Sequence, residues 1–268
     1  MDATNLSYWE QASFFTSDIL IVGSGIVGLN AAITIKKKQP NIIVTVLERG
    51  FLPSGASTKN AGFACFGSIS ELVEQEKICG TDALHQLIGK RWKGLQKLRS
   101  MVGDNKLDLQ INGGFELFKP QDFALSEECV SKIGHFNRLI KDITHHQSAF
   151  EIAKSQINFF GFDGIDSLIK NNLEAQLDPG KMIKALINIA SSLGVTVLNS
   201  CLVNQFEQED KTLLVTTSQG CFRTKKLLFC TNAFASLLIP DLKLKPGRGQ
   251  VLITKPIENL KLKGTFHY

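Results

Sequence analysis

Two short, continuous apolar runs lie near the start of the chain, at residues 19–22 and 42–47. Continuous runs of this length are typical of strands that are buried on both faces, as in a parallel sheet. The segment between them, residues 26–37, is expected to be a helix that ends in basic residues, which favour a helix C-terminus. The pattern therefore predicts a strand, a helix and a second strand of an α/β fold.

A second block with the same character begins at Asp178-Pro179-Gly180, where proline at the first helical position favours a helix start. We expect this helix to continue as far as Gly194. Strand-like runs follow, with a turn at 218–220, at residues 195–198, 201–207, 213–217 and 226–230.

The stretch between these two blocks has a different pattern, in which longer segments show helical spacing of apolar residues. Helices are expected at 69–102, with a break at Cys79-Gly80, and at 126–144. Residues 107–111 and 115–118 are expected to form a hairpin around Asn112-Gly113-Gly114. Residues 157–162 are expected to be extended. These elements predict an α+β lobe inserted into the parallel α/β domain.

The domain organisation expected from these patterns is a Rossmann-like nucleotide-binding domain interleaved with the α+β lobe. With 268 residues, the chain is long enough for two domains. The expected bounds are 1–70 for the first part of the nucleotide-binding domain, 71–176 for the lobe, 177–241 for the second part, and 242–268 for the start of a return to the lobe.

Composition excludes several classes of protein. Hydrophobic residues make up 43% and charged residues 21%, as in ordinary globular proteins, and the net charge of +5 is spread along the chain. Charge therefore does not indicate nucleic-acid binding. The most apolar stretch, residues 19–35, contains glycines and polar residues and follows Asp18, so neither a transmembrane segment nor a signal peptide is expected.

The six cysteines contain no C-x-x-C pair, which favours reduced thiols in a cytoplasmic protein. Cys201, Cys221 and Cys230 fall in or beside expected strands and are predicted to be small core residues. The five histidines have no spacing that indicates a metal site, so no metal is expected.

A glycine-rich turn carries the clearest chemical signal. Gly23, Gly25 and Gly28 follow the first strand at G-x-G-x-x-G spacing. The first glycine permits a tight turn, the second lets the backbone approach a pyrophosphate, and the third lets the helix pack against the strand. The pyrophosphate is expected on the free amide groups at the positive end of the helix dipole.

Glu48 ends the second strand, about twenty residues after Gly28, where a carboxylate can accept hydrogen bonds from both ribose hydroxyls. An acid at this position disfavours a 2′-phosphate, so NADP is not expected. A lone glycine motif can equally be an ordinary turn, but the strand, helix, second strand and acid together predict a site for the ADP half of a dinucleotide.

The loop after this unit reads PSGASTKNAGF over residues 53–63. Together with the glycine turn, it resembles the D-amino-acid oxidase superfamily of FAD-dependent oxidoreductases, which includes glycine oxidase, sarcosine oxidase and γ-glutamylputrescine oxidoreductases. Similar segments continue along most of the chain, at residues 178–180, 195–203, 231–234 and 246–251.

The resemblance implies that FAD binds the Rossmann-like domain as the cofactor and that the interleaved lobe, residues 71–176, binds the substrate. The residues that it implies in FAD binding are Gly23, Ser24, Gly25, Ile26, Val27, Gly28, Glu48, Arg49, Ser57, Thr58, Lys59, Asn60, Ala61, Gly62, Phe63, Val203, Thr231, Asn232 and Ala233. An alternative for Ser57, Thr58 and Asn60, from loop composition alone, is an ordinary polar turn.

Roles follow from the same resemblance. Ser57 and Thr58 are implied at the pyrophosphate, and residues 59–63 along the approach to the isoalloxazine ring. The backbone of Arg49 and Val203 is implied near the adenine, and residues 231–233 beneath the phosphates. Small residues in this loop would let the backbone approach the flavin closely.

The implied activity is oxidation of a C–N bond in an amino acid or small amine, with hydride transfer to flavin N5 and no required side-chain base. Arg248 is a candidate anchor for a substrate carboxylate, although a structural arginine at a strand start is the alternative. A 2-hydroxy acid or a tRNA base as substrate, or an inactive nucleotide-binding fragment, are alternative functions. Oligomeric state and the choice between oxidase and dehydrogenase stay open.

Two terminal features complete the expectations. The family continues beyond a point like residues 264–268, so the resemblance implies an incomplete copy that lacks its C-terminal part. Near the N-terminus, the aromatic residues of 5–15 are expected to pack on the domain, with contact to a partner or a membrane as the alternatives.

Overall fold

The computed structural model describes residues 6–247, 249–251, 253–255 and 257–268. The chain divides into two compact units, each formed by two stretches of sequence. The first unit contains the residues up to Ala61 together with Pro179–Val251, and the second contains Gly62–Asp178 together with the residues from 252 onward.

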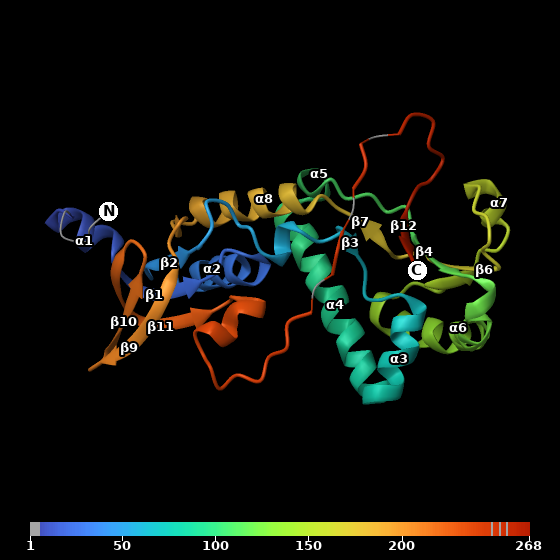
Figure 1. Ribbon diagram of the computed structural model, residues 1–268, viewed down its shortest axis with the longest axis horizontal. Coiled ribbons are helices and arrows are strands. Elements are labelled where there is room, and N and C mark those ends of the chain that lie inside the picture. The colour runs from blue at the N-terminus through green and yellow to red at the C-terminus, as the bar shows by residue number, and fades with distance from the viewer. Residues whose placement is uncertain (1–5, 248, 252, 256) are drawn as a thin grey trace. The chain divides into compact units, whose positions relative to one another are not determined.

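The first unit is built on a six-stranded sheet with the strand order β8-β2-β1-β11-β10-β9 (Figure 1). Strands β8, β2, β1 and β11 are parallel, whereas β10 and β9 continue the sheet in antiparallel pairing. The strands are β1 (Thr16–Val22), β2 (Val44–Leu47), β8 (Thr196–Leu198), β9 (Val203–Glu209), β10 (Thr212–Thr217) and β11 (Gly220–Phe229).

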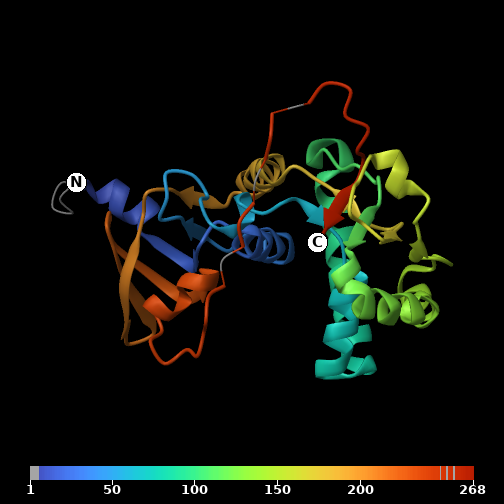
Figure 2. The same ribbon diagram turned by 45° about the vertical axis from the view of Figure 1, so that its right-hand side comes forward.

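Helices α2 (Ile26–Lys38) and α8 (Pro179–Ser192) lie side by side on one face of this sheet, as Figure 2 shows. Leu20 and Ile21 of β1 point to opposite faces and are both fully buried. The expected strand, helix and strand are therefore confirmed, and so is the Rossmann-like α/β class. Strand β11 begins at Gly220, earlier than the sequence pattern predicts.

The second unit contains a four-stranded sheet with the order β12-β4-β6-β5. Its strands are β4 (Gly114–Phe118), β5 (Phe150–Ile152), β6 (Ser167–Asn171) and β12 (Thr265–His267), and β3 (Phe63–Ala64) pairs separately with β7 (Ala175–Gln176). Its helices are α3 (Ile69–Cys79), α4 (Thr81–Val102), α5 (Asp104–Leu107), α6 (Phe123–Thr144) and α7 (Gln156–Phe160). Short 3₁₀ turns occur in the two units at η2 (Ala56–Thr58), η3 (Pro120–Asp122) and η4 (Asn232–Leu237).

The predicted hairpin at residues 107–118 is wrong. Strand β4 pairs with β6 and β12, and Gln110 forms only an isolated bridge with Gln176. The glycines serve packing instead: an ideal Cβ on Gly114 would lie 2.3 Å from the carboxyl carbon of Glu174. A glycine pair that makes room for a buried carboxylate looks like a hairpin turn in sequence.

The predicted extended segment at 157–162 is also wrong, because residues 156–160 form α7. Gly161, at a φ of +74°, ends the helix in the left-handed region. One helical turn places Ile157 in the core and Phe160 against Phe115, with 5.0 Å between the ring centroids. A short apolar run cannot distinguish such a turn from a strand.

Two expectations for individual side chains need correction. All six cysteines are free, but Cys221 is exposed and Cys230 is half-buried, so only Cys201 of the three is a core residue. In the N-terminal segment, Phe15 stacks on Phe222 at 4.5 Å, whereas Trp9 of α1 (Tyr8–Phe14) is 75% exposed. Packing of the aromatic arm is therefore confined to its end.

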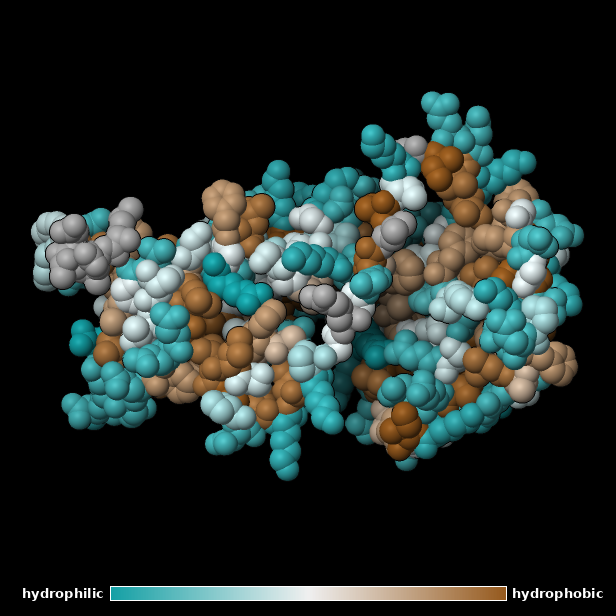
Figure 3. Space-filling model, in the orientation of Figure 1, coloured by the Kyte–Doolittle hydropathy of each residue, from teal (hydrophilic) through white to brown (hydrophobic). Residues whose placement is uncertain are grey.

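Within the described residues, none of the helices has the length and apolar character needed to cross a membrane. In Figure 3, hydrophobic side chains are visible over the region of β9–β11 and η4. The exposed apolar residues of these elements and the following segment include Phe206, Leu228, Phe234, Leu237, Leu242 and Leu244.

Strand β12 is held in the second unit by a buried carboxylate. Glu174 is fully buried, and its Oε1 accepts hydrogen bonds from Thr265 Oγ1 at 2.5 Å and from His267 Nε2 at 2.7 Å. Burial alone would lower the pKa of His267, but the hydrogen bond and charge of Glu174, with Glu116 and Glu71, outweigh it and raise that pKa above 6.5. The protonated imidazole is therefore the form that the fold stabilises.

We predict that this pair makes unfolding pH-dependent. The pKa of His267 is higher in the folded state than in the unfolded state. The contribution of the His267–Glu174 pair to the free energy of unfolding is therefore complete below the unfolded pKa of about 6.5, and it is lost as the pH rises through the folded pKa. The melting temperature should fall as the pH is raised from pH 6. In His267→Gln, the part of this fall that is due to the histidine should be absent. The control His135→Gln should keep it. An unchanged pH profile in His267→Gln would contradict the assignment.

Candidate dinucleotide-binding site

The turn between β1 and α2 is closed by contacts that only glycine permits. Gly23 has a φ of +105°, and an ideal Cβ on it would lie 2.6 Å from the carbonyl oxygen of Cys230. An ideal Cβ on Gly28 would lie 1.9 Å from the carbonyl oxygen of Gly23. Both neighbours are backbone atoms and cannot move independently of the fold. The first and third glycines thus set how closely α2 follows the end of β1.

The N-terminus of α2 lies open to a hydrogen-bond acceptor. Gly25 is the N-cap residue and provides no side chain to cap the helix. The hydroxyl oxygen of Ser57 accepts a hydrogen bond from the amide of Ile26 at 2.9 Å and lies 2.8 Å from an ideal Cβ on Gly25. This is a place where free amides and the helix dipole favour a phosphate oxygen.

Glu48 lies at the end of β2 and faces this turn. Its Oε2 accepts hydrogen bonds from the amide and hydroxyl of Ser24, at 3.2 and 2.7 Å, and its Oε1 accepts one from the amide of Gly50 at 3.0 Å. The residue is only 7% exposed. These bonds fix the carboxylate beside the glycine turn, and its oxygens have further lone pairs for ribose hydroxyls.

The other neighbour of β1 contributes a hydroxyl. Strand β11 ends at Phe229, and Thr231 follows it; an ideal Cβ on Gly23 would lie 3.6 Å from the Thr231 amide nitrogen. Thr231 Oγ1 is buried and has no hydrogen-bond partner among the described residues. A buried hydroxyl without a partner is costly unless a ligand supplies one.

These features test whether the residues fit an ADP group. The space beside Gly25 admits no side chain on that residue, the amide at the start of α2 already binds an oxygen, and Thr231 Oγ1 lacks a partner. Glu48 adds the carboxylate that ribose hydroxyls require. The residues therefore fit the diphosphate and ribose of FAD at the carboxyl ends of parallel strands, where α/β sheets bind ligands.

Thr58 and Asn60 have a different local role. The hydroxyl of Thr58 donates to the carbonyl oxygen of Pro53 at 2.8 Å, and the side-chain amide of Asn60 donates to the carbonyl oxygens of Ala56 and Ser57. Both side chains hold the loop in shape, and the hydroxyl of Ser57 is the one that reaches the helix N-terminus. Their contact with the cofactor stays a prediction.

The remaining predicted residues lie in several elements. Ile26 and Val27 lie in the first turn of α2, and Lys59 and Ala61 are exposed. Val203 is buried at the start of β9, where it is paired with Thr217, and η4 contains Ala233 and Asn232, which has a φ of +47°. Gly62 and Phe63 belong to the second unit. Arg248 lies outside the described residues.

Sequence reasoning missed Phe234. The guanidinium carbon of Arg49 lies 3.7 Å from the centroid of the Phe234 ring, which is the stacking distance of a cation–π pair. Phe234 follows the predicted segment 231–233 directly, and an aromatic residue next to a predicted cofactor segment was the available signal.

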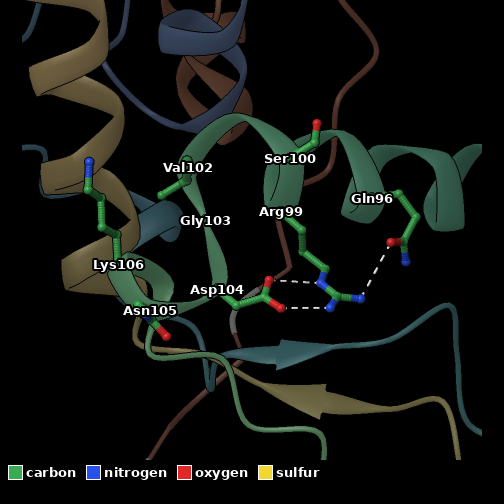
Figure 4. Close-up of a pocket in the computed structure, with 8 residues that line it drawn as sticks. All are labelled: Gln96, Arg99, Ser100, Val102, Gly103, Asp104, Asn105 and Lys106. Carbon is green, nitrogen blue, oxygen red and sulfur yellow. Dashed lines mark hydrogen bonds and ion pairs between the residues drawn. The ribbon is translucent and has the colours of Figure 1, made fainter.

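A separate hollow lies at the junction of α4 and α5 in the second unit. It has a volume of about 600 Å³. The residues that line it are Gln96, Arg99, Ser100, Val102, Gly103, Asp104, Asn105 and Lys106. Figure 4 shows Arg99 binding both carboxylate oxygens of Asp104 across it, at 2.9 and 2.7 Å. The hollow contains none of the predicted site residues. No group of three or more potential metal ligands occurs among the described residues.

The family model of FAD dependent oxidoreductases matches residues 18–267 of the chain. The chain belongs to the FAD dependent oxidoreductase family. This membership covers both units, since the match extends from β1 to β12, and it confirms the resemblance seen in the sequence.

A curated relative is the bifunctional protein ThiO/ThiG of Synechocystis sp. (strain ATCC 27184 / PCC 6803 / Kazusa), which is 27% identical over 244 residues. The match covers 88% of this chain and 33% of that protein. The chain therefore spans about one third of the length of this relative.

Two solved structures have a similar fold. Glycine oxidase from Geobacillus kaustophilus has a TM-score of 0.58 and 19% identity over 84% of this chain and 57% of its own. L-proline dehydrogenase from P. horikoshii has a TM-score of 0.60 and 20% identity over 94% of this chain and 64% of its own. The chain thus spans 57% and 64% of the lengths of these two chains.

We predict opposite effects of two glycine substitutions on stability. Gly28→Ala should lower the free energy of unfolding by about 2–4 kcal/mol, because the new methyl group meets the backbone of Gly23. Gly94→Ala, in the exposed face of α4 with no atom within 4 Å of its ideal Cβ, should raise it by about 0.5–1 kcal/mol. Urea unfolding of both variants measures this. Equal stability of Gly28→Ala and the original protein would show that the turn is looser than described.

Proposed function

We propose that this protein binds FAD and oxidises a C–N bond of an amino acid or small amine. The observation that carries the proposal is the position of Glu48, whose carboxylate faces the glycine turn from the neighbouring strand. Family membership supports FAD as the group bound there.

The proposed holding residues act on different parts of the cofactor. The amides at the start of α2, with Ser57, would bind the pyrophosphate, and Glu48 would bind the adenosine ribose. Thr231 Oγ1 would gain the partner that it lacks. The other predicted cofactor residues, including Lys59–Phe63 near the flavin, stay part of the proposal.

Bound FAD would supply the electron acceptor for removal of hydride from the carbon next to nitrogen. The protein would hold that carbon near the flavin and keep the neutral amine form of the substrate in a site that excludes water. No side-chain base is assigned. Arg248 remains the proposed anchor for a substrate carboxylate.

The names of the relatives favour nitrogen over oxygen at the reacting carbon. The structures of similar fold include glycine oxidase, L-amino acid deaminase from Proteus vulgaris and L-proline dehydrogenase, all of which are named for amino acids. A 2-hydroxy acid would place a C–H bond in the same position and is the second candidate. Because the chain spans 57% of the glycine oxidase, activity itself belongs to the proposal.

The test of this function is a spectrum followed by a titration. Protein refolded with FAD and freed of excess cofactor should show the absorbance of oxidised flavin. Anaerobic addition of glycine, proline, other amino acids and small amines should then bleach it. Bleaching by 2-hydroxy acids with no amine effective would move the substrate to the second candidate, and a protein without any flavin spectrum would refute the function.

We predict that Glu48→Gln weakens FAD binding by about ten- to a hundredfold, since hydrogen bonds to a charged group contribute about 1.5–3 kcal/mol. The amide can keep a hydrogen bond to Ser24, so the turn should remain folded. The dissociation constant of FAD should be measured for this variant and for the control Glu209→Gln on β9. The same affinity in both variants would contradict the assignment of the ribose to Glu48.

A further inference from the structure

A small cavity lies within the second unit, beside the buried carboxylate that holds β12. Its walls come from the start of α3, from all four strands of the β12-β4-β6-β5 sheet and from the loop that follows β6. Its volume is about 10 Å³, and a buried water requires roughly 10–15 Å³. The cavity therefore has room for a single molecule of the size of water.

Two polar atoms of the residues that line this cavity have no hydrogen-bond partner among the described residues. They are Oε2 of Glu174, which is an acceptor, and Nδ2 of Asn171, which is a donor. The two residues are 0% and 3% exposed, so bulk solvent does not satisfy either atom. A buried donor or acceptor without a partner is costly and usually binds an ordered water or a ligand. Both atoms therefore point to an occupant of the cavity.

Each of the two groups is already fixed through its other polar atom. The Oδ1 of Asn171 accepts a hydrogen bond from the amide of Leu173 at 3.1 Å, which also identifies Nδ2 as the free donor. The Oε1 of Glu174 accepts the two hydrogen bonds from β12. A rotation of either group toward the other would break one of these bonds. Next to Oε2 lies Gly114, which has no side chain to offer; an ideal Cβ there would lie 2.4 Å from that oxygen.

We propose that this cavity is a binding site for one water molecule, which accepts a hydrogen bond from Asn171 Nδ2 and donates to Glu174 Oε2 and to the carboxylate of Glu116. Glu116 lines the same cavity and is 8% exposed. Its carboxylate has lone pairs to spare beyond the bonds that it accepts from α3. The water would then make three hydrogen bonds, which is typical of buried water.

The chemistry of the walls excludes ions as the occupant. An anion would meet the carboxylates of Glu116 and Glu174 and could not donate a hydrogen bond to either. A cation would suit the carboxylates but could not accept the hydrogen bond from Asn171 Nδ2, which would stay unpaired. Water is the molecule of this size that both donates and accepts.

The proposed water would complete a polar network that joins four elements of the second unit. Ser70 of α3 binds Glu116 of β4 through its amide and its hydroxyl. Asn171 ends β6, and Glu174 binds β12. A buried network whose members are all satisfied rigidifies the fold, whereas a partly satisfied one is costly. This site lies in the second unit and involves no flavin, so the inference goes beyond the proposed function.

The experiment detects the water by NMR in the whole chain, labelled with ¹⁵N in its asparagine side chains. The side-chain amide of Asn171 should show cross peaks to water of opposite sign in NOE and ROE spectra, which distinguishes bound water from proton exchange. Asn137 is the internal control, because its Nδ2 donates to the carbonyl oxygen of Phe150 at 2.9 Å. Its amide should show no such cross peaks.

A second measurement counts long-lived waters by oxygen-17 relaxation dispersion. In Asn171→Leu, the amplitude should fall by the contribution of one water, whereas the control Asn204→Leu, at an exposed position of β9, should keep it. Circular dichroism checks that both variants are folded, and the spectra of the original chain decide the question if Asn171→Leu is not.

Three results would overturn the proposal. Absence of a water cross peak at Asn171 would mean that its amide binds Glu174 directly. Loss of the cross peak on addition of sodium or potassium chloride would assign the cavity to a cation. An unchanged dispersion amplitude in folded Asn171→Leu would place the long-lived waters elsewhere. A failed flavin test would leave all of these results unaffected.

Discussion

The close approach of two backbone segments at Gly28 and Gly23 is the constraint on which the proposed site depends. An ideal Cβ on Gly28 would come within 1.9 Å of the Gly23 carbonyl oxygen, so α2 can begin here only without a side chain. This approach directs the first amides of α2 to the edge of the sheet where β1 ends. The same edge receives the ends of β2 and β11, which are the two neighbours of β1. Position along a parallel sheet thus brings together residues that are distant in sequence.

The polar side chains beside the glycine turn differ in their hydrogen bonding. Glu48 is nearly buried, and a buried carboxylate requires hydrogen-bond donors; Ser24 and Gly50 supply them from the backbone and from one hydroxyl. Thr231 is the opposite case, since its buried hydroxyl has no partner within the described residues. The carboxylate of Glu48 is therefore satisfied without a ligand, whereas Thr231 Oγ1 would gain a partner from the proposed cofactor.

The sequence predicts the secondary structure correctly where the pattern is local, and it fails where tertiary contacts determine the conformation of a segment. The strands and helix from β1 to β2 follow from continuous apolar runs and a glycine spacing that few other structures require. The hairpin failed because Gly114 makes room for Glu174, a residue that is sixty positions away in sequence. The segment at α7 failed because a helical turn and a strand can bury the same aromatic residues. For the site, spacing could indicate Glu48, but only the fold could show that Phe234 meets Arg49.

The two units place different demands on their polar residues. In the first unit, exposed or unpartnered polar groups gather at one sheet edge, as Arg49 and Thr231 do. In the second unit, the buried Glu174 accepts hydrogen bonds from Thr265 and His267 through Oε1, and in this way it joins β12 to the loop that follows β6, while its Oε2 has no partner among the described residues. A charge enclosed with hydrogen-bond partners contributes to specifying which strand occupies the position beside β4, whereas an exposed charge such as that of Arg49 contributes little to stability.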